Sequence, residues 1–130
     1  MATINKNWSS QNQIIGSGDS WITLSGTTES FSSNVDMVTN GLEGAHLIVE
    51  IDYDNTPTDN IKIKLYGSLN GSDYDDTPVW EMQGDKNIDP QQLSLIIKDL
   101  AHFRISVQQT GSTDSHNVRA YVRCWNYSIS

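Results

Sequence analysis

Cysteine, proline and long apolar runs are all scarce in this chain of 130 residues. Its one cysteine, Cys124, excludes an internal disulfide and argues for folding in a reducing cytosol. The first 13 residues lack the apolar segment of a signal peptide. Apolar runs such as residues 47–49 fall far short of the roughly 20 residues that a membrane-spanning helix needs. We therefore expect no disulfide framework and no membrane partner.

Positive charge is the next scarce quantity, because 16 acidic side chains face 8 lysines and arginines and leave a net charge of −8. Residues 1–97 carry 14 acids and 4 bases, whereas residues 98–130 carry 2 acids and 4 bases. An acidic surface repels phosphate backbones, so nucleic acid is not an expected partner. The uneven distribution of charge can instead orient the domain against another protein.

Alternation of apolar and polar residues is the main pattern that the chain does have. In residues 45–53 every second side chain is apolar, which is typical of a half-buried strand. Similar segments recur between turn-forming stretches such as residues 54–60 and 67–78, and no window shows a convincing helical stripe. About eight such strands predict an all-β fold, a single-domain antiparallel β-sandwich or jelly roll that spans residues 20–130.

Residues 1–19 differ from the rest because they are polar and show no clear period. We interpret them as an N-terminal arm. One interpretation is a terminus without fixed contacts, and the other is an arm that docks on a partner protein. In the second case the isolated apolar residues of the arm are the expected contacts, namely Trp8, Ile14 and Ile15.

The side chains that could take part in catalysis or metal binding form no recognisable catalytic motif. The three histidines lack metal-ligand spacing, and Cys124 falls on an apolar strand face, where a buried structural role is typical. Acids gather in the loops near residues 52–59 and 73–76, but Asp and Asn favour turns for their own reasons. Calcium binding by these loops stays the alternative, although neither matches the twelve-residue calcium loop. We expect a protein that is not an enzyme and that needs no cofactor or metal.

The last predicted strand places cationic and aromatic side chains on one face: Arg119, Tyr121, Arg123, Trp125 and Tyr127. We call these five residues the ladder. Arginine and aromatic residues are enriched at protein interfaces, so the ladder is a candidate contact surface. Two other interpretations stay open at this point. The ladder can pair within the chain with acids such as Glu50 on a neighbouring strand, or it can stack against sugars as in carbohydrate-binding sandwiches.

Several stretches outside the N-terminal arm carry a family resemblance. They are residues 44–54 (GAHLIVEIDYD), 56–60 (TPTDN), 65–78 (LYGSLNGSDYDDTP), 98–105 (KDLAHFRI) and 110–116 (TGSTDSH). Together they resemble small structural proteins encoded by tailed bacteriophages, and the likeness covers roughly residues 40–125. The resemblance provides no binding residue that can be carried over to this chain.

The resemblance implies a virion component of β-sandwich type that is assembled in the host cytoplasm. Small phage β-domains often decorate or cement the capsid, so the major capsid protein is the first expected partner. The first alternative is a subunit associated with the tail, neck or fibre, bound to other virion proteins. The second is a carbohydrate-binding module with Trp80 or Trp125 as the stacking platform. Trimers are common among such proteins, so a homo-oligomer is also an expected state.

Overall fold

The computed structural model describes residues 2–130, and every regular element within them is a β-strand. The 11 strands form two antiparallel sheets. Their bounds are β1 Ile4–Trp8, β2 Asn12–Ile15, β3 Ile22–Thr23, β4 Ser30–Phe31, β5 Val35–Asp36, β6 Gly44–Asp52, β7 Ile61–Ser68, β8 Trp80–Gln83, β9 Gln91–Lys98, β10 His102–Gln109 and β11 Asn117–Ile129.

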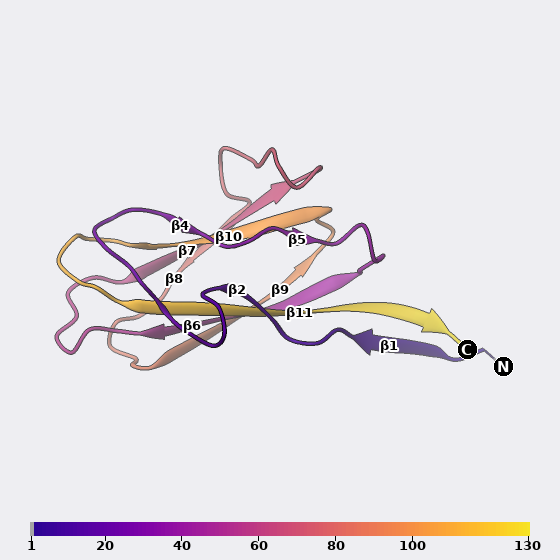
Figure 1. The fold of residues 1–130 in the computed structure, drawn as a ribbon, viewed down its shortest axis with the longest axis horizontal. Coiled ribbons are helices and arrows are strands. Elements are labelled where there is room, and N and C mark those ends of the chain that lie inside the picture. Colours follow the sequence, from indigo (N-terminus) through magenta and orange to yellow (C-terminus); the bar gives the residue numbers. More distant parts are fainter. Residues whose placement is uncertain (1) are drawn as a thin grey trace.

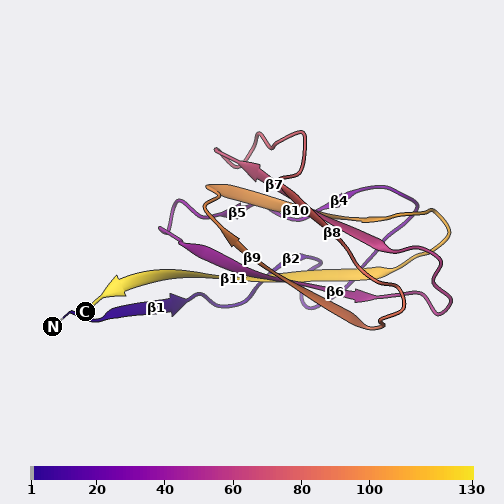
Figure 2. The ribbon, with the colours of Figure 1, turned by 180° about the vertical axis from the view of Figure 1, so that it is seen from behind.

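The two sheets lie face to face as the layers of a sandwich (Figure 1). The six-stranded sheet has the order β1-β11-β6-β9, and β2 and β3 also pair with β11. The five-stranded sheet has the order β4-β10-β7-β8, and β5 also pairs with β10. The predicted all-β sandwich is therefore confirmed. Seen from behind, β11 runs beneath the second sheet and continues past it toward the chain termini (Figure 2).

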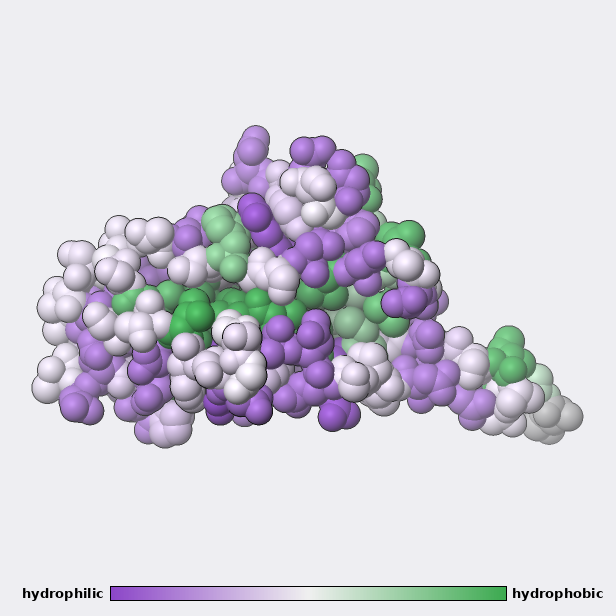
Figure 3. All heavy atoms as spheres, in the orientation of Figure 1, coloured by the Kyte–Doolittle hydropathy of each residue, from purple (hydrophilic) through white to green (hydrophobic). Residues whose placement is uncertain are grey.

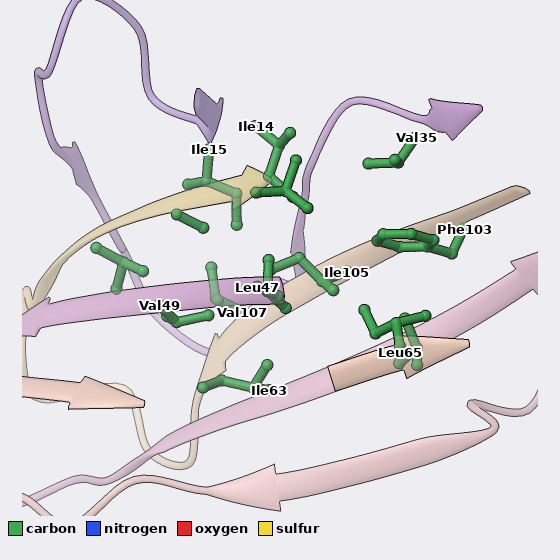
Figure 4. Close-up of a cluster of buried hydrophobic side chains, with 14 of the residues drawn as sticks. Ile14, Ile15, Val35, Leu47, Val49, Ile63, Leu65, Phe103, Ile105 and Val107 are labelled. Carbon is green, nitrogen blue, oxygen red and sulfur yellow. The ribbon is translucent and has the colours of Figure 1, made fainter. Parts of the chain in front are cut away.

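The core lies between the sheets and follows from the period-two pattern of the long strands (Figure 4). In β6, Leu47, Val49 and Ile51 are fully buried, while the residues between them lie on the outer face. Phe103 and Ile105 of β10 face them from the second sheet and are also fully buried. Apolar side chains at alternate positions thus fill the space between the layers without any helix in residues 2–130.

Two parts of the chain depart from a simple series of alternating strands. Residues 28–37 contain two short strands, β4 and β5, which pair with different parts of β10. The N-terminal segment expected as an arm contains β1 and β2, both paired with β11. Ile14 and Ile15 are 4% and 3% exposed and belong to the core. Sequence inspection missed this because four residues are too few to display a period.

One end of the sandwich is closed by a buried polar network. Asp114 is 4% exposed, and its carboxylate accepts hydrogen bonds of 2.7 Å from the backbone N–H groups of Thr58 and Asp59. The ring of His116 is fully buried, and its Nδ1 accepts a hydrogen bond of 3.0 Å from the backbone N–H of Asp54. Its Nε2 therefore carries the proton and lies 2.9 Å from the carbonyl oxygen of Asp59. These hydrogen bonds, together with the ring of Tyr53 4.9 Å from that of His116 between centroids, hold two loops together.

Cys124 is 6% exposed and packs in the core, with its sulfur 3.9 Å from the sulfur of Met37. Burial raises the pKa of its thiol, which lowers the thiolate fraction at neutral pH. We expect Cys124 to react with a thiol reagent about two orders of magnitude more slowly in the folded protein than in urea. Absorbance of the released chromophore measures the two rates. Equal rates in both conditions would contradict the buried position.

Candidate functional site

The most distinctive surface is a two-stranded projection that extends from the six-stranded sheet (Figure 1). In it, β1 pairs with residues 125–129 of β11, from Ile4 opposite Ile129 to Trp8 opposite Trp125. The register between β11 and β6 ends at Trp125 opposite Gly44, so residues 126–129 pair with β1 alone. We call residues 4–8 and 125–129 the ribbon. The second sheet does not cover it, and both termini lie at its far end (Figures 1 and 2).

The ribbon is amphipathic because directly paired residues share a face and the faces alternate along each strand. One face carries apolar and aromatic side chains together with Lys6; its residues are Ile4, Lys6, Trp8, Trp125, Tyr127 and Ile129. The opposite face is polar. There Asn5 donates a hydrogen bond to the hydroxyl of Ser130, and Asn7 donates one to the hydroxyl of Ser128.

The apolar face of the ribbon is open to solvent. Ile4 is 71% exposed, Ile129 is 75% exposed and Tyr127 is 51% exposed, and these three residues line an open hollow of about 500 Å³. In the space-filling view, a small hydrophobic patch lies near the end of the projection, among neutral and hydrophilic residues (Figure 3). An isolated two-stranded ribbon is marginally stable in water. Burying this face against a partner would remove apolar surface from water and stabilise the ribbon at the same time.

The base of the ribbon is held by an aromatic cluster. The rings of Trp8 and Trp125 lie 5.0 Å apart between centroids, and the ammonium of Lys6 lies 4.8 Å and 4.3 Å from them. Trp125 is only 3% exposed because it also covers Gly44, where an added Cβ would lie 2.1 Å from the indole ring. A glycine is therefore required opposite Trp125. This cluster fixes the direction in which the ribbon leaves the sheet.

The other end of the ladder is covered by residues of the same chain. Arg119 donates a hydrogen bond of 2.7 Å from Nε to Glu50, and this contact is the largest of the effects that raise the pKa of the guanidinium. Its guanidinium carbon lies 4.1 Å from the ring centroid of Trp21. The hydroxyl of Tyr121 donates to the carboxylate of Asp19, which raises the pKa of the phenol. The pairing within the chain that sequence inspection left open is present here.

The structure thus separates the residues expected to contact a partner. Tyr127 and Trp8 are exposed on the ribbon, and Arg123 is exposed beside it. Ile14, Ile15 and Trp125 are buried in this folded form, so they present little surface to a partner, and their role as contacts stays a prediction. The buried ring of Trp125 is also not open to a sugar. Tyr121 is 8% exposed and Arg119 is partly covered.

Sequence inspection missed Ile4 and Ile129, the two most exposed apolar residues of the ribbon. Each is an isolated isoleucine close to a terminus, where no period can be recognised. The available signal was in the ladder itself, since Ile129 continues its alternation two residues beyond Tyr127. The pairing of β1 with β11 brings Ile4 beside Ile129. Alternation within one segment cannot predict which distant segment will pair with it.

The side chains that could take part in catalysis or metal binding do not form a cluster. Within residues 2–130 no group of three or more histidine, cysteine, aspartate or glutamate side chains is placed to hold a metal ion. His116 is fully buried, and His102, the first residue of β10, lies against Asn34 and Asp36. In the same described part of the chain, no helix has the length and apolar character needed to cross a membrane. The candidate site is the exposed apolar face of the ribbon.

Comparison with known proteins finds likeness of fold. No protein-family model matches the chain, and no curated protein matches its sequence. A solved structure of Bacillus endospore appendages, described as a family of disulfide-linked pili, is 10% identical, with a TM-score of 0.49 and coverage of 97% of this chain and 90% of that one. Yersinia pseudotuberculosis-derived mitogen is 11% identical, with a TM-score of 0.46 and coverage of 97% and 86%.

With identities of 10% and 11% and TM-scores below 0.5, these likenesses carry no argument about what this chain does. The bacteriophage affiliation, the partner and the place in a virion stay predictions from the sequence resemblance.

Proposed function

We propose that this protein is a non-enzymatic structural component of a bacteriophage virion that docks through the apolar face of its ribbon, most simply as a capsid decoration or cement protein. The observation that carries the docking part is the open apolar face formed by Ile4, Tyr127 and Ile129. The virion part rests on the sequence resemblance. The major capsid protein is the proposed partner, and a place at the tail, neck or fibre is the alternative.

The physical argument for docking is that the ribbon leaves apolar side chains in contact with water, and a partner could bury them. Burying an isoleucine or a large aromatic side chain completely is worth roughly 1.5–3 kcal/mol. Three such residues on one narrow face provide a compact apolar centre, and exposed polar residues surround it. The ribbon also presents free strand edges beyond Trp125, which can add to a sheet of the partner.

Charge adds a second requirement for the partner. Lys6 is the only charged residue on the apolar face, while Lys98 and Arg123 lie near its base, so the ribbon is locally basic in a chain of net charge −8. A partner surface that is apolar with acidic residues around it complements this face. Binding to the assembled shell alone would shift the equilibrium toward the assembled state and so stabilise the capsid.

The experiment is co-sedimentation of the purified protein with phage particles that lack it, scored as copies bound per particle. Hundreds of copies would support a place on the capsid lattice, and a dozen or fewer would favour the neck, the tail or a special vertex. No binding would overturn the virion proposal. The apolar face could also be covered by a second or third copy of the same chain. Sedimentation equilibrium of the free protein measures whether it forms such a dimer or trimer.

Substitution of Ile129 by serine is expected to weaken particle binding about tenfold or more, because one apolar contact near the centre of the interface is lost. Leu69→Ser is the matched control, since Leu69 is 90% exposed but lies in the loop between β7 and β8, away from the ribbon. Both variants should unfold at the same urea concentration as the parent protein. Equal loss of binding in the two variants would contradict docking through the ribbon.

A further inference from the structure

A second surface of the six-stranded sheet, away from the apolar face of the ribbon, has the features of a ligand site. Arg119 of β11 lies opposite Glu50 of β6, and Glu50 lies opposite Gln92 of β9. Residues at paired positions of neighbouring strands share a face. The three polar side chains therefore form one row across the outer face of the sheet. Trp21, which precedes β3, stands at the Arg119 end of this row.

This row lines a pocket of about 270 Å³ together with an aromatic ring and a proline. Its lining residues are Trp21, Glu50, Pro90, Gln91, Gln92 and Arg119. The volume lies just under the range of roughly 300–1,000 Å³ found for ligand pockets, which suits a small ligand. Trp21 and Pro90 provide apolar surface, and the three residues of the row provide hydrogen-bonding groups. Such a combination recognises a ligand that has both an apolar face and several hydroxyl groups.

The polar groups of the pocket are held before a ligand arrives. Arg119 is fixed from two sides, because its Nε donates to Glu50 at 2.7 Å and one terminal nitrogen donates to the carbonyl oxygen of Asp19 at 2.7 Å. Arg119 and Glu50 keep 24% and 26% of their side chains exposed, so they can still be reached from solvent. Trp21 is 36% exposed while its ring is packed against Arg119. Positioned groups of this kind reduce the entropic cost of binding.

The charge of the pocket selects against anions. Arg119 is already neutralised by Glu50, and the chain as a whole has a net charge of −8. A phosphate or carboxylate ligand would meet no unpaired cation among the lining residues. Hydroxyl groups, in contrast, can donate to Glu50 and Gln92 and accept from Gln92 and Arg119. A neutral ring with hydroxyl groups at its edge and C–H groups on its face fits these requirements.

We propose that the pocket formed by Trp21, Glu50, Gln92 and Arg119 binds a neutral pyranose sugar, with the sugar ring against Trp21 and its hydroxyl groups on the polar row. The pocket lies on the body of the sandwich, so this inference does not rest on docking through the ribbon. It also moves the sugar platform away from Trp125, which is buried, to a tryptophan that is open to solvent.

The test is NMR titration of the full chain with methyl pyranosides of glucose, galactose, mannose and N-acetylglucosamine, with glycerol as an acyclic polyol control. The expected result is a saturable shift of the Trp21 indole N–H and the Gln92 side-chain amide with at least one pyranoside, in the millimolar range typical of a single small ring. The corresponding methyl uronide should bind more weakly because of Glu50. No saturable shift with any pyranoside would overturn the proposal, and tighter binding of the uronide would overturn the assignment of a neutral ligand.

Two variants locate the binding. Trp21→Ala is expected to lower the affinity about tenfold or more, and Gln92→Ala about threefold, because Gln92 contributes one of several polar groups. Trp8→Ala is the matched control, since Trp8 is an exposed tryptophan of the same sheet that lies outside the pocket. Unchanged affinity in Trp21→Ala, or a larger loss in Trp8→Ala, would place the sugar elsewhere and contradict the inference. The unfolding midpoint in urea confirms that each variant is folded.

Discussion

Replacement of Asp114 by alanine is expected to lower the free energy of unfolding by roughly 3–5 kcal/mol, because a buried carboxylate that holds two loops through charge-assisted hydrogen bonds is lost. The buried carboxylate accepts from the N–H groups of Thr58 and Asp59, and it lies 3.2 Å from the imidazole of His116. Alanine would leave these partly buried donors without their acceptor, and a hydrogen bond to a charged group contributes about 1.5–3 kcal/mol. Urea unfolding followed by circular dichroism measures the difference.

The matched control for this prediction is Asp76→Ala, which removes an exposed carboxylate from the loop between β7 and β8. Its expected effect lies within about 0.5 kcal/mol of zero. Asp114→Asn should lie between the two, because it loses the charge but can keep an acceptor oxygen at the position of Oδ2, which accepts both backbone hydrogen bonds. If Asp114→Ala were as stable as Asp76→Ala, the buried network would not be what closes this end of the sandwich.

The same residue predicts how stability depends on pH. Burial by itself raises the pKa of Asp114, but hydrogen bonds from Asp59 and Thr58 and the nearby His116 outweigh it, so the pKa lies below its ordinary value of 3.8. A carboxyl whose pKa is lower in the folded state stabilises the fold above the unfolded pKa, and this contribution is lost as pH falls through the folded value. We expect the parent protein to lose more stability than Asp114→Asn as pH falls from about 5 to about 2.

The alternation within single segments was sufficient to predict most of the fold. The six-stranded sheet is built around β6 and β11, and the period-two pattern is clear in β6 and in the first residues of β11. Each buries one face against the second sheet, so local pattern and tertiary environment agree. β4 and β5 escaped prediction as separate strands because their pairing depends on β10, and two-residue strands contain no pattern of their own.

The candidate site was predicted only in part for a related reason. Alternation correctly placed the five residues of the ladder on one face of β11. It carries no information on which other segments cover that face. Residues 19–21 cover its first part, and β1 covers the middle of it at Trp125. Both coverings come from the N-terminal segment, whose pairing with β11 joins residues more than 100 positions apart. Contacts between residues so far apart in the sequence cannot be predicted from the pattern of neighbouring residues.

Replacement of Trp125 by alanine is expected to lower the free energy of unfolding by about 3–5 kcal/mol, the usual cost of removing a buried tryptophan. The indole fills the space above Gly44 and packs against Trp8 and Lys6. Without it, Trp8 and Lys6 lose the ring against which they pack, and β1 loses its main apolar contact with β11. Faster amide exchange at Lys6 and Tyr127 should accompany the loss of stability.

Tyr127→Ala is the variant that distinguishes loss of fold stability from loss of a direct contact with the partner. Tyr127 lies on the same face two residues further along β11 but is 51% exposed, so its removal should change stability by less than about 1 kcal/mol. If the ribbon is the docking surface, both variants lose particle binding, Trp125→Ala through disorder of the ribbon and Tyr127→Ala through loss of a contact. If Trp125→Ala retained full stability and still failed to bind, Trp125 would be a direct contact, as its place in the ladder predicts. If both variants bound like the parent protein, the partner would contact another surface, and the exposed face of the ribbon would need a different explanation.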